Sequence, residues 1–144
     1  MIDAQTELYG IIGNPVRHSL SPIIHNGAFR RTGWNAVYLA FEVENLRKAL
    51  SGIKGLGIRG VSVTTPFKNE VIPYLDRIDP IAGKIKAVNT IANEGGKLIG
   101  YNTDWCGALK ALEEKIDLEG KRVILLGAGG AARAIGFGLK ERGC

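Results

Sequence analysis

The chain has 144 residues, of which 45% are hydrophobic and 23% charged, and 19 Lys and Arg against 14 Asp and Glu give a formal net charge of +5. This composition is typical of a globular chain holding one domain, or one domain and part of another. No apolar run approaches the roughly 18 residues of a membrane span, and Met1 to Gly10 lacks the basic and apolar regions of an export signal. Two cysteines are too few for a disulfide framework or a zinc site, so we expect a cytoplasmic protein without a structural metal.

The positive charge does not have the pattern of a nucleic-acid-binding protein. Basic residues are spread from Arg17 to Arg142, and no run is longer than Arg30-Arg31. A surface that binds nucleic acid concentrates its basic residues on one face or stripe. We therefore expect neither nucleic acid nor a membrane as a partner.

The first half of the chain alternates between apolar runs and helical patterns. Residues 8–12 predict a short strand, and Ser21-Pro22 predicts the start of a helix to about residue 32, with Ser21 as its N-cap. The alternation continues with a strand over 36–43, a helix over about 45–54 and a strand over 60–63.

The second half repeats this alternation. Thr65-Pro66 and Asp79-Pro80 predict helices that run to about residues 74 and 86. Asn93-Glu94-Gly95-Gly96 separates two apolar runs, 88–92 and 98–101, and predicts a β-hairpin. A helix from Thr103 to about Lys115, a strand over 122–126 and a last helix then follow. Strands that alternate with helices predict an α/β fold with a mainly parallel sheet.

Residues 127–132, Gly-Ala-Gly-Gly-Ala-Ala, fit the G-x-G-x-x-G/A pattern of a dinucleotide-binding turn. The first glycine makes the turn, the second lets the backbone approach a pyrophosphate, and Ala132 permits close helix packing. Free amides at the start of the following helix favour a phosphate. We therefore predict that a dinucleotide binds here, and the alternative is a structural turn that binds nothing. The predicted cofactor contacts are Gly127, Ala128, Gly129, Gly130 and Ala131.

The glycine turn lies close to Cys144, the last residue of the sequence. A dinucleotide fold needs further parallel strands and, about 20 residues past the glycines, a group that reads the ribose or its phosphate. We infer that the chain is the front part of a longer enzyme. Residues 1–103 would form a substrate-binding domain, and 104–144 a connecting helix and the start of a Rossmann-like nucleotide domain. The predicted strand at 122–126 would have an unpaired edge, so a homodimer is also expected.

Ser19 and Ser21 place two hydroxyls at the predicted junction of a loop and a helix. Hydroxyls beside the free amides of a helix start can hold a carboxylate or sugar-like hydroxyls. The alternative is that Ser21 is an ordinary N-cap without a ligand. His18 and His25, which lie nearby, are interpreted as packing or hydrogen-bonding residues.

Polar residues also follow three predicted strands, where an open α/β sheet binds its ligands. Lys68 falls in the first turn of a predicted helix, where the helix dipole disfavours a cation, and Asp104 falls where the dipole favours an anion. If the two met in a partly dry cleft, they could transfer a proton. The alternative is a surface ion pair that contributes about 0–1 kcal/mol.

Five segments in this order resemble the shikimate dehydrogenase family, which includes quinate dehydrogenases. They are residues 14–26, 63–68, 87–90, 100–104 and 127–131. The family reduces 3-dehydroshikimate to shikimate with NADPH, in the pathway to aromatic amino acids. The resemblance implies NADP as cofactor and Lys68 with Asp104 as the catalytic pair, Lys68 transferring the proton. It further implies that the substrate carboxylate binds Ser19 and Ser21, and that the ring hydroxyls bind Thr64, Lys68, Asn89 and Asp104.

The chain departs from the family pattern beside this site. Ser62 stands where members often carry Asn, and Thr65 replaces a common apolar residue. The choice between shikimate and quinate therefore stays open, and a non-catalytic module that binds shikimate is a further alternative. The basic loop for the NADPH phosphate and the later substrate glutamine of the family do not occur in the sequence. We therefore expect the 144 residues alone to bind substrate weakly and to show negligible turnover.

Overall fold

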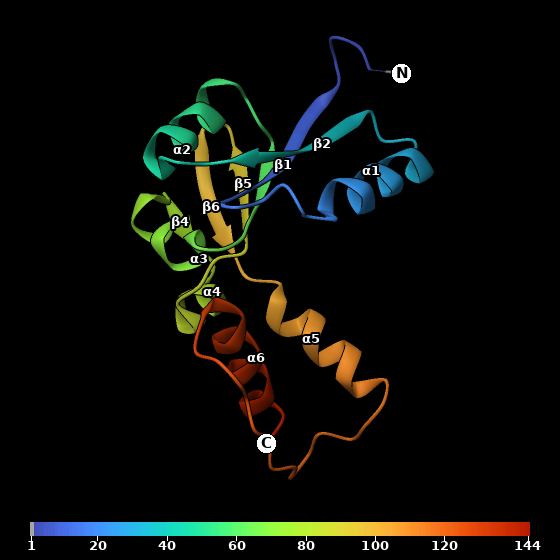
Figure 1. Ribbon diagram of the computed structural model, residues 1–144, viewed down its shortest axis with the longest axis vertical. Coiled ribbons are helices and arrows are strands. Elements are labelled where there is room, and N and C mark those ends of the chain that lie inside the picture. Colours follow the sequence, from blue (N-terminus) through green and yellow to red (C-terminus); the bar gives the residue numbers. More distant parts are fainter. Residues whose placement is uncertain (1) are drawn as a thin grey trace.

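The computed structural model describes residues 2–144 and is built on a six-stranded mixed sheet with the order β2-β1-β3-β5-β6-β4 (Figure 1). Strand β1 is parallel to β2 and β3, and β4 is parallel to β6, whereas β5 is antiparallel to both of its neighbours. The predicted α/β fold with a mainly parallel sheet is confirmed. The strands are β1 (Glu7–Gly13), β2 (Ala36–Glu42), β3 (Gly60–Val63), β4 (Arg77–Ile78), β5 (Thr90–Glu94) and β6 (Lys97–Tyr101).

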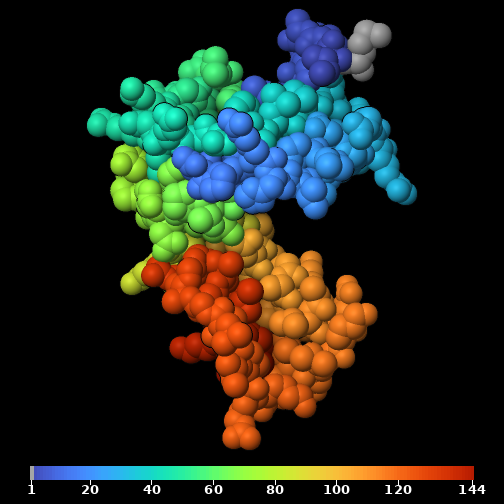
Figure 2. Space-filling model, viewed as in Figure 1, coloured from blue at the N-terminus to red at the C-terminus, as the bar shows by residue number. Residues whose placement is uncertain are grey.

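The helices lie around the sheet and below it. In Figure 2 the sheet and its helices form one body, and the C-terminal segments, in orange and red, form a second body joined to it by a narrower region. In residues 2–144, no helix is both long and apolar enough to cross a membrane. The helices are α1 (Ser21–Thr32), α2 (Leu46–Gly55), α3 (Phe67–Glu70), the 3₁₀ turn η1 (Ile72–Tyr74), α4 (Pro80–Ile85), α5 (Asp104–Glu113) and α6 (Gly130–Glu141).

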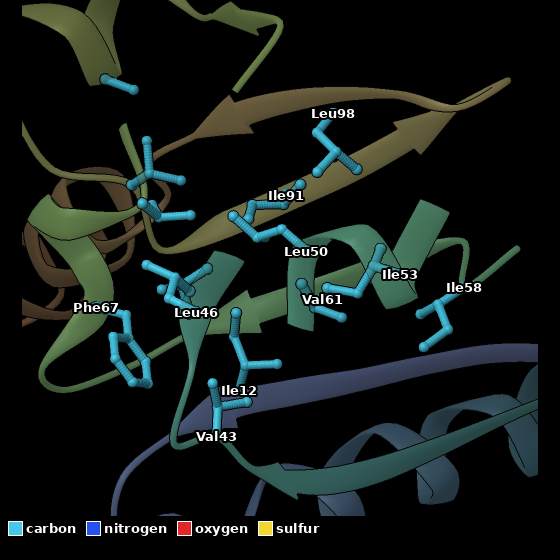
Figure 3. Close-up of a cluster of buried hydrophobic side chains, with 14 residues drawn as sticks. Ile12, Val43, Leu46, Leu50, Ile53, Ile58, Val61, Phe67, Ile91 and Leu98 are labelled. Carbon is cyan, nitrogen blue, oxygen red and sulfur yellow. The ribbon is translucent and has the colours of Figure 1, made fainter. Parts of the chain in front are cut away.

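The main hydrophobic core lies between α2 and the sheet (Figure 3). Leu46, Leu50 and Ile53 recur at helical spacing, so all three point from α2 onto the sheet and are buried. The Asn45 side chain caps this helix by accepting a hydrogen bond from the backbone N–H of Lys48, at 3.0 Å. Ile12 and Val63 carry the core to the C-terminal ends of β1 and β3. The core thus fixes the strand ends from which the polar segments emerge.

Two predicted helix starts are different in the structure. Leu20, and not Ser21, occupies the N-cap of α1, and Ser21 is already the first helical residue, its amide donating to the Ser19 hydroxyl. Pro66, and not Thr65, precedes α3, which ends at Glu70 before the separate turn η1. A continuous helix to residue 74 fails because Pro73 has no backbone N–H to donate.

One strand was missed and one predicted strand was wrong. The two-residue strand β4 has too short an apolar run to be visible in the sequence. Residues 122–126, predicted as a strand, are irregular, and Ile124 and Leu126 are 88% and 91% exposed. A strand needs a hydrogen-bonded neighbour, and none of the residues 2–144 provides one for this segment. The helix predicted after the glycine turn is present as α6.

Gly100→Ala should destabilise the fold by about 1–3 kcal/mol, because a Cβ there would press on the side chains of a filled core. It would lie 2.9 Å from Val88 Cγ2 and closer still to Leu75 Cδ1. The matched control is Gly52→Ala in α2, where a Cβ meets nothing within 4 Å. This variant should gain about 0.5–1 kcal/mol from helix propensity. Urea unfolding of both variants measures the free energies, and equal effects would contradict the packing described.

Asp76 should make the stability of the fold sensitive to acid. Hydrogen bonds from the Lys54 ammonium and the Leu98 amide hold the pKa of Asp76 below its ordinary value of 3.8. A lowered pKa stabilises the fold above pH 3.8, and this contribution is lost as the pH falls through the folded-state value. We expect Asp76→Asn to reduce the dependence of Tm on pH in this window.

The control for Asp76 is Glu44→Gln, which removes an exposed carboxylate that forms no ion pair within the described part of the chain. It should leave the profile of Tm against pH unchanged. If Asp76→Asn has the wild-type profile, the two hydrogen bonds do not contribute to acid sensitivity.

Candidate active site

Lys68 and Asp104, which are 36 residues apart in the sequence, form an ion pair. The Lys68 Nζ lies 2.6 Å from Asp104 Oδ2. Lys68 is in α3, which follows β3, and Asp104 is the first residue of α5, which follows β6. The two side chains are 19% and 28% exposed, so the pair is shielded and still reachable from solvent. Such a site allows a proton to be passed to a bound molecule and replaced from water.

Asn89 holds the other carboxylate oxygen of Asp104. Its Nδ2 donates to Asp104 Oδ1 at 2.8 Å and to Thr103 Oγ1 at 2.9 Å. Its Oδ1 accepts from the Thr103 amide and the Thr90 hydroxyl, both at 2.9 Å. The Thr103 side chain bonds to Asn89 and does not cap α5. The sequence-based prediction that Thr103 caps this helix is therefore wrong. The carboxylate is therefore held in one orientation by an ammonium and an amide.

Asn102 supports the same carboxylate from inside the protein. It is 5% exposed, its Nδ2 donates to the Ala87 carbonyl at 2.9 Å, and its Oδ1 accepts from the Asp104 amide at 3.0 Å. Sequence reasoning did not single it out, although an Asn two residues before an Asp is a typical turn-forming signal. Through these two bonds, Asn102 ties the backbone of Asp104 to the segment that precedes Asn89.

The predicted serine residues lie on the side of β3 away from the Lys68–Asp104 pair. Ser19 lines a cavity of about 310 Å³ together with His18, Thr64 and Thr65. The Ser19 Oγ lies 3.2 Å from the Ser21 amide, whose hydrogen bond it accepts. The structure thus brings Ser19 and Thr64 to one cavity, at the start of α1 and the end of β3.

Tyr38 and Ser62 connect the two groups of polar residues, a role that sequence reasoning missed for Tyr38. The Tyr38 hydroxyl donates to Ser62 Oγ at 2.7 Å, and Ser62 faces Thr90 across the β3–β5 pairing. Burial raises the pKa of Tyr38, although hydrogen bonding to the hydroxyls of Ser62 and Ser21 opposes the effect. Tyr38 therefore stays protonated and able to donate.

The two histidines do not form a joint site. His25 stacks on Tyr38, with ring centroids 4.2 Å apart and planes 12° from parallel, so it packs as expected. His18 is exposed at the rim of the Ser19 cavity. Within residues 2–144, no three side chains of the His, Cys, Asp and Glu types come together in a way that could hold a metal ion.

The glycine turn lies against Lys68. A cavity of about 410 Å³ is lined on one side by residues 128–131 and on the other by residues of the 65–69 segment, including Lys68. A Cβ on Gly130 would lie 3.1 Å from Lys68 Cβ, so only glycine allows this approach without a shift. Gly129 precedes α6, and no described side chain caps the helix. The first amides of α6 therefore suit an anionic group, and the turn fits a dinucleotide phosphate.

Comparison with known proteins finds similarity to one family. Residues 11–91 match the family model of the shikimate dehydrogenase substrate binding domain. The shikimate dehydrogenase (NADP(+)) of Moorella thermoacetica is 55% identical over 99% of this chain and 50% of its own length. That of Aquifex aeolicus is 53% identical over 99% of this chain and 54% of its own.

Solved structures give the same result. The crystal structure of shikimate dehydrogenase from Aquifex aeolicus superposes with a TM-score of 0.97 at 53% identity, over 99% of this chain and 55% of that one. The Thermus thermophilus enzyme in complex with NADP(H) and shikimate has a TM-score of 0.89 at 40% identity, over 96% of this chain and 53% of that one. The chain thus spans about half the length of these relatives. Because the family model covers more than half of its residues, the chain belongs to the family of the shikimate dehydrogenase substrate binding domain.

Proposed function

We propose that the chain is the N-terminal half of an NADP-dependent shikimate dehydrogenase that reduces 3-dehydroshikimate to shikimate. The observation that carries this proposal is the shielded Lys68–Asp104 pair, bonded to Asn89 and lying beside a glycine turn at the start of a helix. A hydride-transfer enzyme needs this combination, a proton donor next to a place for a nicotinamide cofactor. The names and bound ligands of the relatives support it.

The substrate would lie between the serines and the ion pair. Ser19 and Ser21 would bind its carboxylate through their hydroxyls and the amides at the start of α1. The ring hydroxyls would then reach Thr64, Lys68, Asn89 and Asp104. The shared cavity of Ser19 and Thr64 and the bonding of the other three residues support this placement.

Lys68 would act as the proton donor. NADPH, when bound, supplies a hydride to the substrate ketone carbon, which leaves negative charge on the ketone oxygen. The Lys68 ammonium stabilises this charge and transfers one of its protons to that oxygen. Asp104 and Asn89 hold the ammonium in place, and because the pair is partly exposed, solvent returns the proton to Lys68.

Residues 127–131 would hold the pyrophosphate of the cofactor on the first amides of α6. The domain boundary would fall at residues 103–104, where the sheet body ends and α5 begins. In support, α5 and α6 share a separate cluster, Leu109, Leu118 and Leu139, that lies outside the sheet core. A cytoplasmic location, consistent with the two free thiols, and a homodimer stay predictions.

Quinate is a second candidate substrate because Ser62 replaces a larger residue common in the family. The Ser62 hydroxyl accepts a hydrogen bond from Tyr38 at 2.7 Å, and serine has a shorter side chain than asparagine. The ratio of kcat/KM for shikimate and quinate, measured on the full-length protein, decides between the two.

The change Lys68→Ala should lower kcat of the full-length enzyme about 10²-fold or more, because it removes the proton donor. The change in nicotinamide absorbance during shikimate oxidation with NADP measures kcat. The control is Lys84→Ala, which removes an exposed lysine of α4 and should have wild-type turnover. Near-normal kcat in Lys68→Ala would contradict the assignment. Shikimate binding without turnover by the wild-type protein would favour a non-catalytic binding module.

The 144 residues by themselves should bind shikimate weakly and show negligible turnover, because a single glycine turn and one helix do not enclose a dinucleotide. Calorimetric titration with shikimate and the same absorbance assay, run beside the full-length protein, measure both properties. Robust turnover by the 144 residues would show that the cofactor needs much less protein than proposed.

A further inference from the structure

Helix α1 begins at Ser21, two residues after Ser19, yet apolar packing does little to fix this helix on the sheet. None of its residues 21–32, all of which the structure describes, is buried. Ile23 and Ile24 are 70% and 64% exposed, and the contact with the sheet comes from half-buried side chains such as Phe29. A helix without a buried apolar face needs another interaction to set its rotation and its distance from the sheet.

Asn26 supplies a directional contact of this kind. Its Nδ2 donates to the carbonyls of Tyr38 and Pro22, both at 2.8 Å. Its Oδ1 accepts from the Tyr38 amide at 2.9 Å. The side-chain amide uses both of its donors and its acceptor, so it has one orientation. Pro22 lies in the first turn of α1, next to Ser21.

The place of Tyr38 in the sheet explains why an amide fits there. β2 is an edge strand, so the backbone N–H and C=O of Tyr38 that point away from β1 have no strand to pair with. The Asn26 amide has the same donor and acceptor as a peptide group and bonds to both. One side chain therefore ties the start of α1 to the residue whose hydroxyl bonds to Ser62.

We propose that Asn26 is a positioning residue that holds the Ser19 and Ser21 hydroxyls in place for the substrate carboxylate. The part that concerns the carboxylate rests on the proposed function. Asn26 acts on the substrate only through α1 and Tyr38. Its removal should therefore weaken substrate binding and leave the proton transfer at Lys68 intact.

The test uses the full-length protein with Asn26→Ala and Asn26→Asp. Asn26→Ala should raise KM for shikimate about tenfold, the effect of one weakened hydrogen bond to a charged group, with kcat and KM for NADP within about twofold of wild type. Asn26→Asp should raise KM for shikimate at least as much as Asn26→Ala does, because a carboxylate oxygen would face the carbonyls of Pro22 and Tyr38. Asn45→Ala, which removes the side-chain cap of α2 and no hydrogen bond of α1, should leave KM unchanged.

Amide hydrogen exchange of the ligand-free protein provides a second readout that does not depend on turnover. The amides of residues 19–21, of residues 23 and 24, and of Tyr38 should exchange faster in Asn26→Ala than in wild type, and at the wild-type rate in Asn45→Ala. If Asn26→Ala fails to fold, Asn26→Ser, which keeps a shorter donor and acceptor, is measured in both assays.

The outcomes separate the two proposals. Unchanged exchange in the Asn26 variants overturns the positioning role. Faster exchange with an unchanged KM shows that the serines do not need this anchor, and also overturns it. If the wild-type enzyme does not turn over shikimate, the proposed function fails, and the exchange data still decide whether Asn26 fixes the start of α1.

Discussion

The site depends on bringing an ammonium and a carboxylate together where neither is fully solvated. Removing the two charges from water costs free energy that offsets much of their attraction, so the pair does not hold its own elements in place. Packing holds them instead. Phe67, next to Lys68, is buried in the sheet core, and Leu109 of α5 is buried in the cluster with α6. Each charge is thus anchored by a different hydrophobic cluster, and the ion pair forms where the two bodies of the molecule meet.

Local signals in the sequence predicted most of the sheet body and failed where structure depends on distant partners. Glycine and proline marked the ends of β1, β3 and the β5–β6 hairpin, because turns have strict local requirements. Residues 122–126 have the composition of a strand, but a strand is defined by its neighbour, and this segment has none among the described residues. Lys68 and Asp104 stood out because each follows a strand. Tyr38 and Asn26 did not, since their bonds join a helix to an edge strand and leave no local pattern.

The comparisons separate what the fold determines from what the side chains determine. A 5-ketofructose reductase of Gluconobacter sp. strain CHM43 shares the fold at a TM-score of 0.88 and 36% identity, so this architecture also occurs in a reductase named for a different ketone. Function on a shared fold is set by the residues of the site. In the proposed function, the bonded group of Lys68, Asp104 and Asn89 would transfer the proton, and the serine side, with Tyr38 and Ser62, would select the ring.

The reversed direction of β5 determines where the chain tolerates change. Strand β5 is antiparallel to both β3 and β6. Thr90 and Tyr101 are therefore paired at one end of these strands, where Thr90 also faces Ser62, and Gly95-Gly96 forms the hairpin turn at the opposite end. Both of these glycines have positive φ, and a Cβ on either would meet nothing within 4 Å. A peptide epitope or a fluorescent label inserted between them would project into solvent, a full strand length from the chemistry, and would report on the protein without disturbing it.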